Sequence, residues 1–229
     1  MVAAANAPQP GFFGKVKSHG DFVSRRLPTQ FSNRWDQWLQ LGLQASRAAL
    51  GSRWLALYQA CPIWRFAIGA GVCDGQSWAG IMMPSADRVG RHFPLTIAAG
   101  VAGDAPLLEW VGSAIDWYDA LETCALSTLG EHFVLDDFDQ ILRSLHLPIG
   151  LTAVATGARR FQIDGIDDLH TLMPMLAQQI AETSLREYTL WWTEGSQQVA
   201  ASLLVCHGLP STSQYMAMLS GQWQLGGWR

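Results

Sequence analysis

The chain has 229 residues, of which 49% are hydrophobic and 15% charged, and its formal net charge is −4 at pH 7. This composition excludes an intrinsically disordered chain, which needs low hydrophobicity and high net charge. No apolar run reaches the roughly 18 residues expected of a membrane span, and an isoelectric point near 5.8 with scattered arginines argues against nucleic-acid binding.

The start of the chain predicts an opening strand and a long helix. The apolar segment 11–16 predicts the strand. Apolar side chains then recur every three or four residues, which predicts a helix that begins at Thr29 or Ser32. This spacing places Trp35 and Trp38 on the buried face of the helix.

After the first helix, the pattern changes to a short helix and then to strands. Helical spacing continues over 53–60, and Pro62 ends this unit. Three apolar segments follow, and an Asp-Gly turn predicts that the first two form a hairpin. These strands are predicted over 63–70, 78–83 and 93–99.

The second half of the chain predicts further helices and a last pair of strands. The helices are predicted over 105–129, 135–145, 167–184 and 212–219. The strands are predicted over 188–193 and 199–206. Adjacent residues on a strand point to opposite faces. One ring of the pair Trp191 and Trp192 should therefore face away from the core that holds the other.

These elements predict one domain, because no linker or repeat interrupts them. We expect a flexible N-terminal tail over 1–10 and a single domain over 11–229. Helices large enough to cover both faces of a sheet favour an α/β fold, a three-layer α-β-α sandwich. Several strand pairs look like hairpins, so the central sheet should be mixed rather than all parallel.

Charge is divided unevenly along the chain. Residues 1–92 hold ten Lys and Arg and four Asp and Glu, whereas residues 93–229 hold five and fifteen. The stretch 104–139 has nine acidic residues and no Lys or Arg. Such asymmetry indicates either a charged partner or two halves that neutralise each other within one fold, and we favour the second interpretation.

The four cysteines and six histidines show no spacing typical of a metal site. No GxxxxGK[ST] or GxGxxG motif follows a predicted strand, so we predict no metal, nucleotide or other cofactor. The start MVAAANAPQP lacks the basic and apolar regions of a signal peptide. This favours the reducing cytoplasm and four free, buried thiols.

The segment SHGD at 18–21 contains the residue types of a hydrolase triad. Residues this close on one turn rarely adopt the linear triad geometry, so we favour a turn held by local hydrogen bonds. The catalytic alternative is a small hydrolase that uses His19 and Asp21 with Ser85 or Cys61.

The polar segment Pro84–His92 (PSADRVGRH) joins two predicted strands and carries two arginines. Arginine binds carboxylate or phosphate through a planar fork. We favour a structural role, in which Arg88 and Arg91 pair with Asp21, Asp87 or the acidic stretch. The alternatives are a protein-partner surface and a small anionic ligand. Cations that could join either surface are Arg25 and Arg26.

Two segments together resemble the signature of the TagF family. The first is GFFGKVKSHGDFVSRRL at 11–27, followed by Phe31 and by WDQWL at 35–39. The second is PSADRVGRHFPL at 84–95. The order and spacing of the two segments fit the family as well, and the rest of the chain matches by pattern only.

TagF-like proteins are encoded with type VI secretion systems and hold the apparatus inactive after translation. They do so by binding a forkhead-associated scaffold protein, Fha. The resemblance therefore implies an α-β-α sandwich and a cytoplasmic, non-enzymatic repressor without a cofactor. The signature residues that it places at a binding site are His19, Asp21, Arg25, Arg26, Asp87, Arg88 and Arg91.

Two other functions stay open from the sequence. One is the small hydrolase, which needs a nucleophile about 3 Å from a base beside a cleft. The other is a structural subunit of the secretion apparatus. A binding protein instead needs an exposed apolar or aromatic patch with a polar rim.

Overall fold

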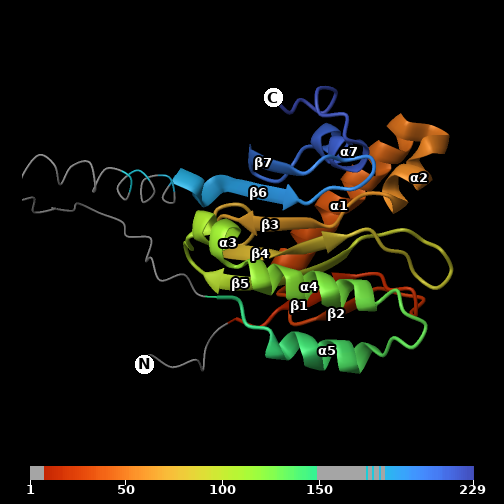
Figure 1. Ribbon diagram of the computed structural model, residues 1–229, viewed down its shortest axis with the longest axis horizontal. Helices are drawn as coiled ribbons and strands as arrows, with labels where there is room; N and C mark the ends of the chain where they lie inside the picture. Colours follow the sequence, from red (N-terminus) through yellow and green to blue (C-terminus); the bar gives the residue numbers. More distant parts are fainter. Residues whose placement is uncertain (1–7, 149–173, 175–176, 178–180, 182–183) are drawn as a thin grey trace, which may run out of the picture.

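The computed structural model describes residues 8–148, 174, 177, 181 and 184–229. Seven strands of this part form one sheet, in the order β2-β1-β5-β4-β3-β6-β7 (Figure 1). The strands are β1 Gly11–Gly14, β2 Val23–Arg25, β3 Trp64–Ile68, β4 Gln76–Met83, β5 Leu95–Ala102, β6 Tyr188–Thr193 and β7 Ser202–His207.

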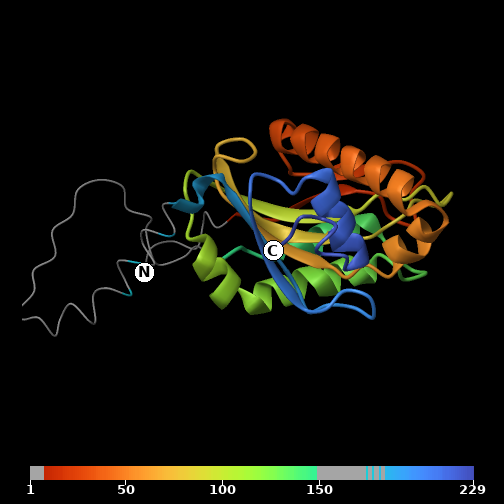
Figure 2. The ribbon, with the colours of Figure 1, turned by 90° about the horizontal axis from the view of Figure 1, so that it is seen from above.

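Helices cover both faces of the sheet, so the predicted three-layer α/β fold is confirmed. Figure 2 shows α1 on one face and α3 and α4 on the other. The α-helices are α1 Thr29–Leu50, α2 Trp54–Gln59, α3 Leu107–Ser113, α4 Ile115–Ser127, α5 Leu135–Ser144 and α7 Thr212–Ser220. Two short 3-10 helices are η2 Gly51–Arg53 and η3 Leu185–Glu187.

The sheet differs from the expected mixed one, because each pairing between its described strands is antiparallel. Strands that follow one another along the chain supply the pairs β1–β2, β3–β4, β4–β5 and β6–β7. A parallel pair needs a long crossover connection, and these short returns need none. The two long connections, which bring β5 beside β1 and β6 beside β3, also return antiparallel.

Each face of the sheet has its own apolar core. Phe31, Trp35 and Leu39 of α1 pack with Phe66 on one face. On the other face, Tyr118 of α4 joins a second cluster. Alternating side chains of the central strands serve both clusters, which explains why β3 is buried at every position.

The adjacent tryptophans on β6 point to opposite faces, and both faces are covered. Trp191 is fully buried, with its ring centroid 5.8 Å from that of Trp35. Trp192 is half-buried, and its ring centroid lies 4.7 Å from that of Tyr118. The expectation of opposite orientations is confirmed, and the ring that leaves one core enters the other.

Four further expectations need correction. Trp38 is half-buried rather than largely buried, and its Nε1 donates to the Pro210 carbonyl at 2.7 Å. The helix expected over 105–129 breaks at Ala114, where Gly112 and Ser113 have low helix propensity. Strand β2 was not expected, because it has three residues and buries only Val23.

The fourth correction concerns the N-terminal segment. Residues 1–7 lie outside the described part, but Pro10 is buried. The Pro8 carbonyl accepts from the Leu147 amide at 3.2 Å. The segment expected to be a flexible tail is thus packed at its described end. Most of the helix predicted over 167–184 also lies outside the described residues.

Candidate functional site

Two loops far apart in the sequence lie side by side at one end of the sheet (Figure 1). Strand β1 pairs with β5, so the loop that follows β1 and the loop that precedes β5 meet at the same end. The Ser85 hydroxyl donates to the Lys15 carbonyl at 2.7 Å. The Arg88 amide donates to the His19 carbonyl at 2.9 Å. We call residues 15–22 and 84–93 the paired loops.

Asp87 is the anchor of the paired loops. Its side chain is fully buried and accepts at Oδ2 from Lys15 Nζ at 2.8 Å and from Arg91 Nε at 2.6 Å. Its Oδ1 accepts from the amides of Val89 and Arg91 at 3.1 and 2.9 Å. The carboxylate therefore fixes the backbone of its own loop and ties that loop to the one after β1.

The same contacts set the charge state of this carboxylate. Burial alone would raise the pKa of Asp87, but the hydrogen bonds from Lys15 and from the backbone and side chain of Arg91 outweigh it. The pKa is held well below its usual range. Asp87 is thus an ionised structural group, already satisfied by its own loops.

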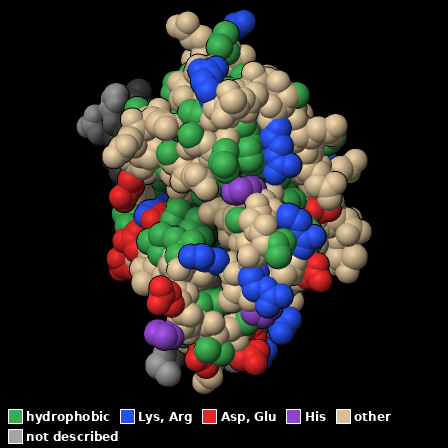
Figure 3. Space-filling model, turned by 90° about the vertical axis from the view of Figure 1, so that its right-hand side faces the viewer, with side chains coloured by type: hydrophobic (Ala, Val, Ile, Leu, Met, Phe, Trp, Pro, Cys, Tyr) green, Lys and Arg blue, Asp and Glu red, His purple; other side chains and the backbone are tan. Residues whose placement is uncertain are grey.

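A cavity of about 630 Å³ opens beside Asp87. Its cationic lining comes from Lys17 and Arg88, both exposed, and Tyr58, His92 and Leu129 line the rest. On the face shown in Figure 3, Lys and Arg side chains gather beside an apolar patch. The volume lies within the range of about 300–1,000 Å³ that is usual for ligand sites.

The wall of the cavity at His92 is aromatic and is kept neutral. The His92 ring lies edge-on to Trp54 and Tyr58, with centroids 5.8 and 5.5 Å apart. Burial, and then the nearby Arg47 guanidinium, lower the pKa of His92. Arg47 itself stacks on Trp54 at 4.3 Å from the ring centroid. This wall adds an apolar surface with a cation behind it.

Exposed apolar side chains flank the same site. Val89 is 67% exposed, Leu129 49% and Phe22 46%. The Phe22 ring is held in place by Phe13 and Phe93, with centroids 5.4 and 4.8 Å away. A fixed aromatic side chain beside free cations is typical of a protein-binding surface.

The structure brings together five of the seven predicted site residues. His19, Asp21, Asp87, Arg88 and Arg91 all lie in the paired loops. Arg91 donates to the Gly20 carbonyl and lies 3.8 Å from the exposed Asp21 carboxylate. The expectation that this loop is pinned by ion pairs therefore holds for Arg91, whereas the Arg88 side chain has no ion pair or hydrogen bond to another described residue.

Arg25 and Arg26 do not join the site. Arg25 is exposed on β2 and donates to the adjacent Ser24 carbonyl. Arg26 has a left-handed backbone (φ 58°), and its guanidinium binds Asp139 and the Pro10 carbonyl. Arg26 therefore links the end of β2 to α5 and to the N-terminal segment, which is a structural role.

The comparisons with known proteins agree with the two signature segments. Residues 11–145 match the model of the TagF N-terminal domain, described as type VI secretion system-associated. The chain belongs to the TagF family. Its similarity extends to the crystal structure of PA0076 from Pseudomonas aeruginosa PAO1, with 34% identity and a TM-score of 0.81 over 93% of this chain and 94% of that one. No curated protein matches the chain.

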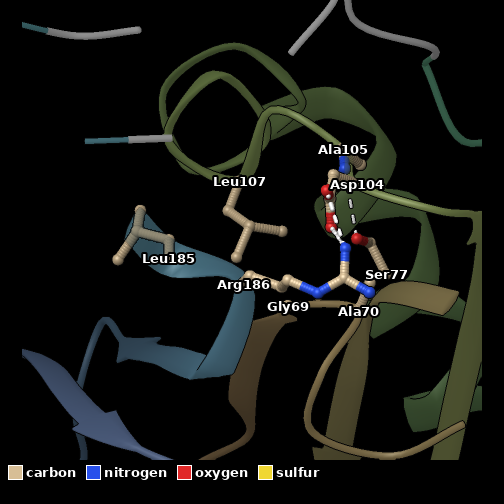
Figure 4. Close-up of a pocket in the computed structure, with 8 residues that line it drawn as sticks. All are labelled: Gly69, Ala70, Ser77, Asp104, Ala105, Leu107, Leu185 and Arg186. Atoms are coloured by element: carbon tan, nitrogen blue, oxygen red, sulfur yellow. Dashed lines mark hydrogen bonds and ion pairs between the residues drawn. The ribbon is translucent and has the colours of Figure 1, made fainter. Parts of the chain in front are cut away.

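Family membership supports an accessory role in type VI secretion, and the charge pattern of this TagF domain now has a partly internal explanation. Arginines from other elements meet the acidic stretch 104–139. Figure 4 shows one such contact, in which Arg186 reaches Asp104 across a small pocket that both residues line. The other pairs that join distant elements are Arg26–Asp139, Arg65–Asp119 and Arg65–Glu122.

The hydrolase alternative finds no assembled triad among the described residues of the TagF fold. The Ser85 hydroxyl is buried and committed to the Lys15 carbonyl. Cys61 is buried, and burial raises the pKa of its thiol to about 12. His19 Nδ1 forms a hydrogen bond with its neighbour Ser18 at 2.8 Å, and the Asp21 side chain is 99% exposed.

Two further features, a metal centre and a membrane-spanning helix, have no candidate among the described residues. No group of three or more described His, Cys, Asp or Glu side chains is arranged to hold an ion. None of the helices in the described ranges is both long and apolar enough to cross a bilayer.

Sequence reasoning missed Lys15, Lys17, Tyr58 and His92 at this site of the TagF domain. Lys15 carried a usable signal, because a lysine that continues the apolar strand segment GFFGKV needs a buried acidic partner. Tyr58 and His92 carried none. His92 already lies in the second of the paired loops, whereas Tyr58 reaches the cavity because α2 packs against that loop, where Tyr58 Oη binds the backbone of Ser85.

Proposed function

We propose that this protein is a cytoplasmic, non-enzymatic repressor of type VI secretion that binds the forkhead-associated scaffold of the apparatus. Binding withholds the scaffold from assembly. The observation that carries the proposal is the build of the two family-signature segments. They form one surface that is tied together at its centre, where Asp87 pairs with Lys15 and Arg91. The exposed Arg88 side chain has no ion pair or hydrogen bond to another described residue.

The geometry favours a domain-to-domain contact over phosphopeptide display by this chain. Forkhead-associated domains recognise phosphothreonine through basic residues. The surface presented by the paired loops is instead cationic and apolar, with Phe22 and Val89 exposed beside Arg88. We therefore expect binding to survive phosphatase treatment of both proteins.

The direct test is to measure the association of the two purified proteins by calorimetry. We expect a complex at micromolar concentrations that weakens as salt rises, because charge steers and orients such encounters. Secretion should rise when the gene is deleted and fall when it is overexpressed.

The matched control is Arg34→Ala, which removes an exposed arginine of α1 outside the paired loops. This variant should bind the scaffold like the wild type. The proposal is wrong if wild-type protein and scaffold do not associate at micromolar concentrations and deletion leaves secretion unchanged.

A further inference from the structure

The cavity beside Asp87 brings together two cationic side chains that have no ion pair or hydrogen bond to another described residue. They belong to Lys17 and Arg88, which line it. By contrast, the guanidinium groups of Arg26, Arg65 and Arg186 all bind carboxylates. A net positive charge therefore faces the cavity.

Hydrogen bonds fix the backbone of the loop that carries Arg88. The Arg88 amide donates to the His19 carbonyl, and Gly90 takes a left-handed conformation (φ 82°) that closes the turn on Asp87. Among the described residues that line the cavity, Asp87 is the one carboxylate, and it is paired with Lys15 and Arg91. It cannot neutralise Arg88 without breaking those bonds.

Part of the remaining lining is apolar, and the cavity has room for more than a single charged group. Pro84, Tyr58 and Leu129 line the cavity, and Leu129, in the turn that follows α4, is 49% exposed. A simple anion would fill a small part of about 630 Å³. A site that pairs cations with an apolar wall suits a peptide that carries both kinds of side chain.

We propose that this cavity binds an acidic segment of a protein partner, with a carboxylate on Arg88 and Lys17 and a neighbouring apolar side chain against Leu129 and Pro84. The proposal rests on the proposed function, since the scaffold is the expected owner of the segment. It adds the chemistry of recognition: a carboxylate rather than a phosphate, carried by a segment that enters the cavity within the larger domain-to-domain contact.

The first experiment uses a defined probe. A fluorescein-labelled peptide of alternating glutamate and leucine is titrated with the protein, beside the same peptide with glutamine in place of glutamate. We expect only the acidic peptide to bind. Arg88→Glu and Lys17→Glu should each weaken it by at least about tenfold, because each reverses one contact charge. Arg34→Glu reverses an exposed arginine outside the cavity and should leave the affinity within about twofold of the wild type.

Competition separates the possible ligands. Unlabelled acidic peptide should displace the probe, whereas inorganic phosphate at the same concentration should not. Equal binding of the two labelled peptides, or displacement by phosphate, overturns the proposal. So does wild-type affinity in Arg88→Glu.

The second experiment repeats the charge reversals with the intact scaffold and separates the two proposals. If the scaffold binds wild type and all three variants equally, the cavity is not its site and this inference fails, while the proposed function stands. If the scaffold binds neither the wild type nor any variant, but the acidic peptide binds as expected, the proposed function fails. The inference that the cavity binds an acidic segment then stands.

Discussion

Two regions of this protein carry much of its charge and use it in different ways. In the layer of α3, α4 and α5, acidic side chains meet arginines that come from other elements, as Asp139 meets Arg26 and Glu122 meets Arg65. At the paired loops, one carboxylate is enclosed by two cations, and two further cations are left facing a cavity. Local charge therefore does not mark a binding site by itself, and the two regions differ in whether their charged side chains are paired with one another.

The strongest test of this contrast at the paired loops is Asp87→Asn. Lys15 is only 8% exposed at its side chain, so it would lose its buried counter-charge. We expect the melting temperature to fall by roughly 10 °C, as for a broken buried ion pair in a domain of this size. Thermal melts followed by circular dichroism measure it.

The control for Asp87→Asn lies in the same loops. Asp21→Asn removes a carboxylate that is 99% exposed, and it should leave the melting temperature unchanged. A wild-type melting temperature for Asp87→Asn would mean that the anchor is not the source of the loops' rigidity.

The corresponding test in the helical layer is Arg65→Met. The Arg65 side chain is 6% exposed and binds Glu122 at 2.5 Å and Asp119 at 2.7 Å. Both carboxylates are partly exposed, so solvent screens the pair. We expect a loss of about 2 kcal/mol in the free energy of unfolding, measured by urea denaturation. Arg34→Met should stay within about 0.5 kcal/mol of the wild type, and an equal loss in both would erase the contrast.

Acid should distinguish the anchor from the free cations. The pKa of Asp87 is lowered in the folded protein, whereas an unfolded aspartate titrates near about 3.9. Its contribution to stability is therefore complete above about pH 4 and is lost as the pH falls below that value, because the unfolded chain binds the proton first. We expect the melting temperature of Asp87→Asn to fall less steeply below about pH 4 than that of the wild type. Parallel pH profiles would contradict this.

Much of the fold followed from the sequence because the pattern is strong where the sheet is buried. Apolar runs predicted β3, β4 and β5, and helical spacing predicted α1. The predicted hairpin of β3 with β4 and the last pair of β6 with β7 are confirmed. The pairings of β1 with β5 and of β3 with β6 did not follow from the sequence, because they depend on long-range packing. Strand β2 was invisible for a local reason, since a single buried residue makes no periodic signal.

The candidate site followed in part for the same physical reason. The two signature segments named Asp87, Arg88 and Arg91, but nothing in the local pattern says which arginine is paired. Arg26 and Arg88 look alike in sequence, and only the fold sends the first to Asp139 and leaves the second at the cavity.

The smallest expected effect on stability gives the most direct test of the whole account. In Arg88→Ala, the free energy of unfolding should stay within about 0.5 kcal/mol of the wild type, because the side chain has no ion pair among the described residues. Binding of the forkhead-associated scaffold, measured by calorimetry on the same sample, should weaken by about tenfold. Unchanged binding together with a clear loss of stability would show that Arg88 stabilises the paired loops and does not contact the partner, which would contradict the proposed binding site.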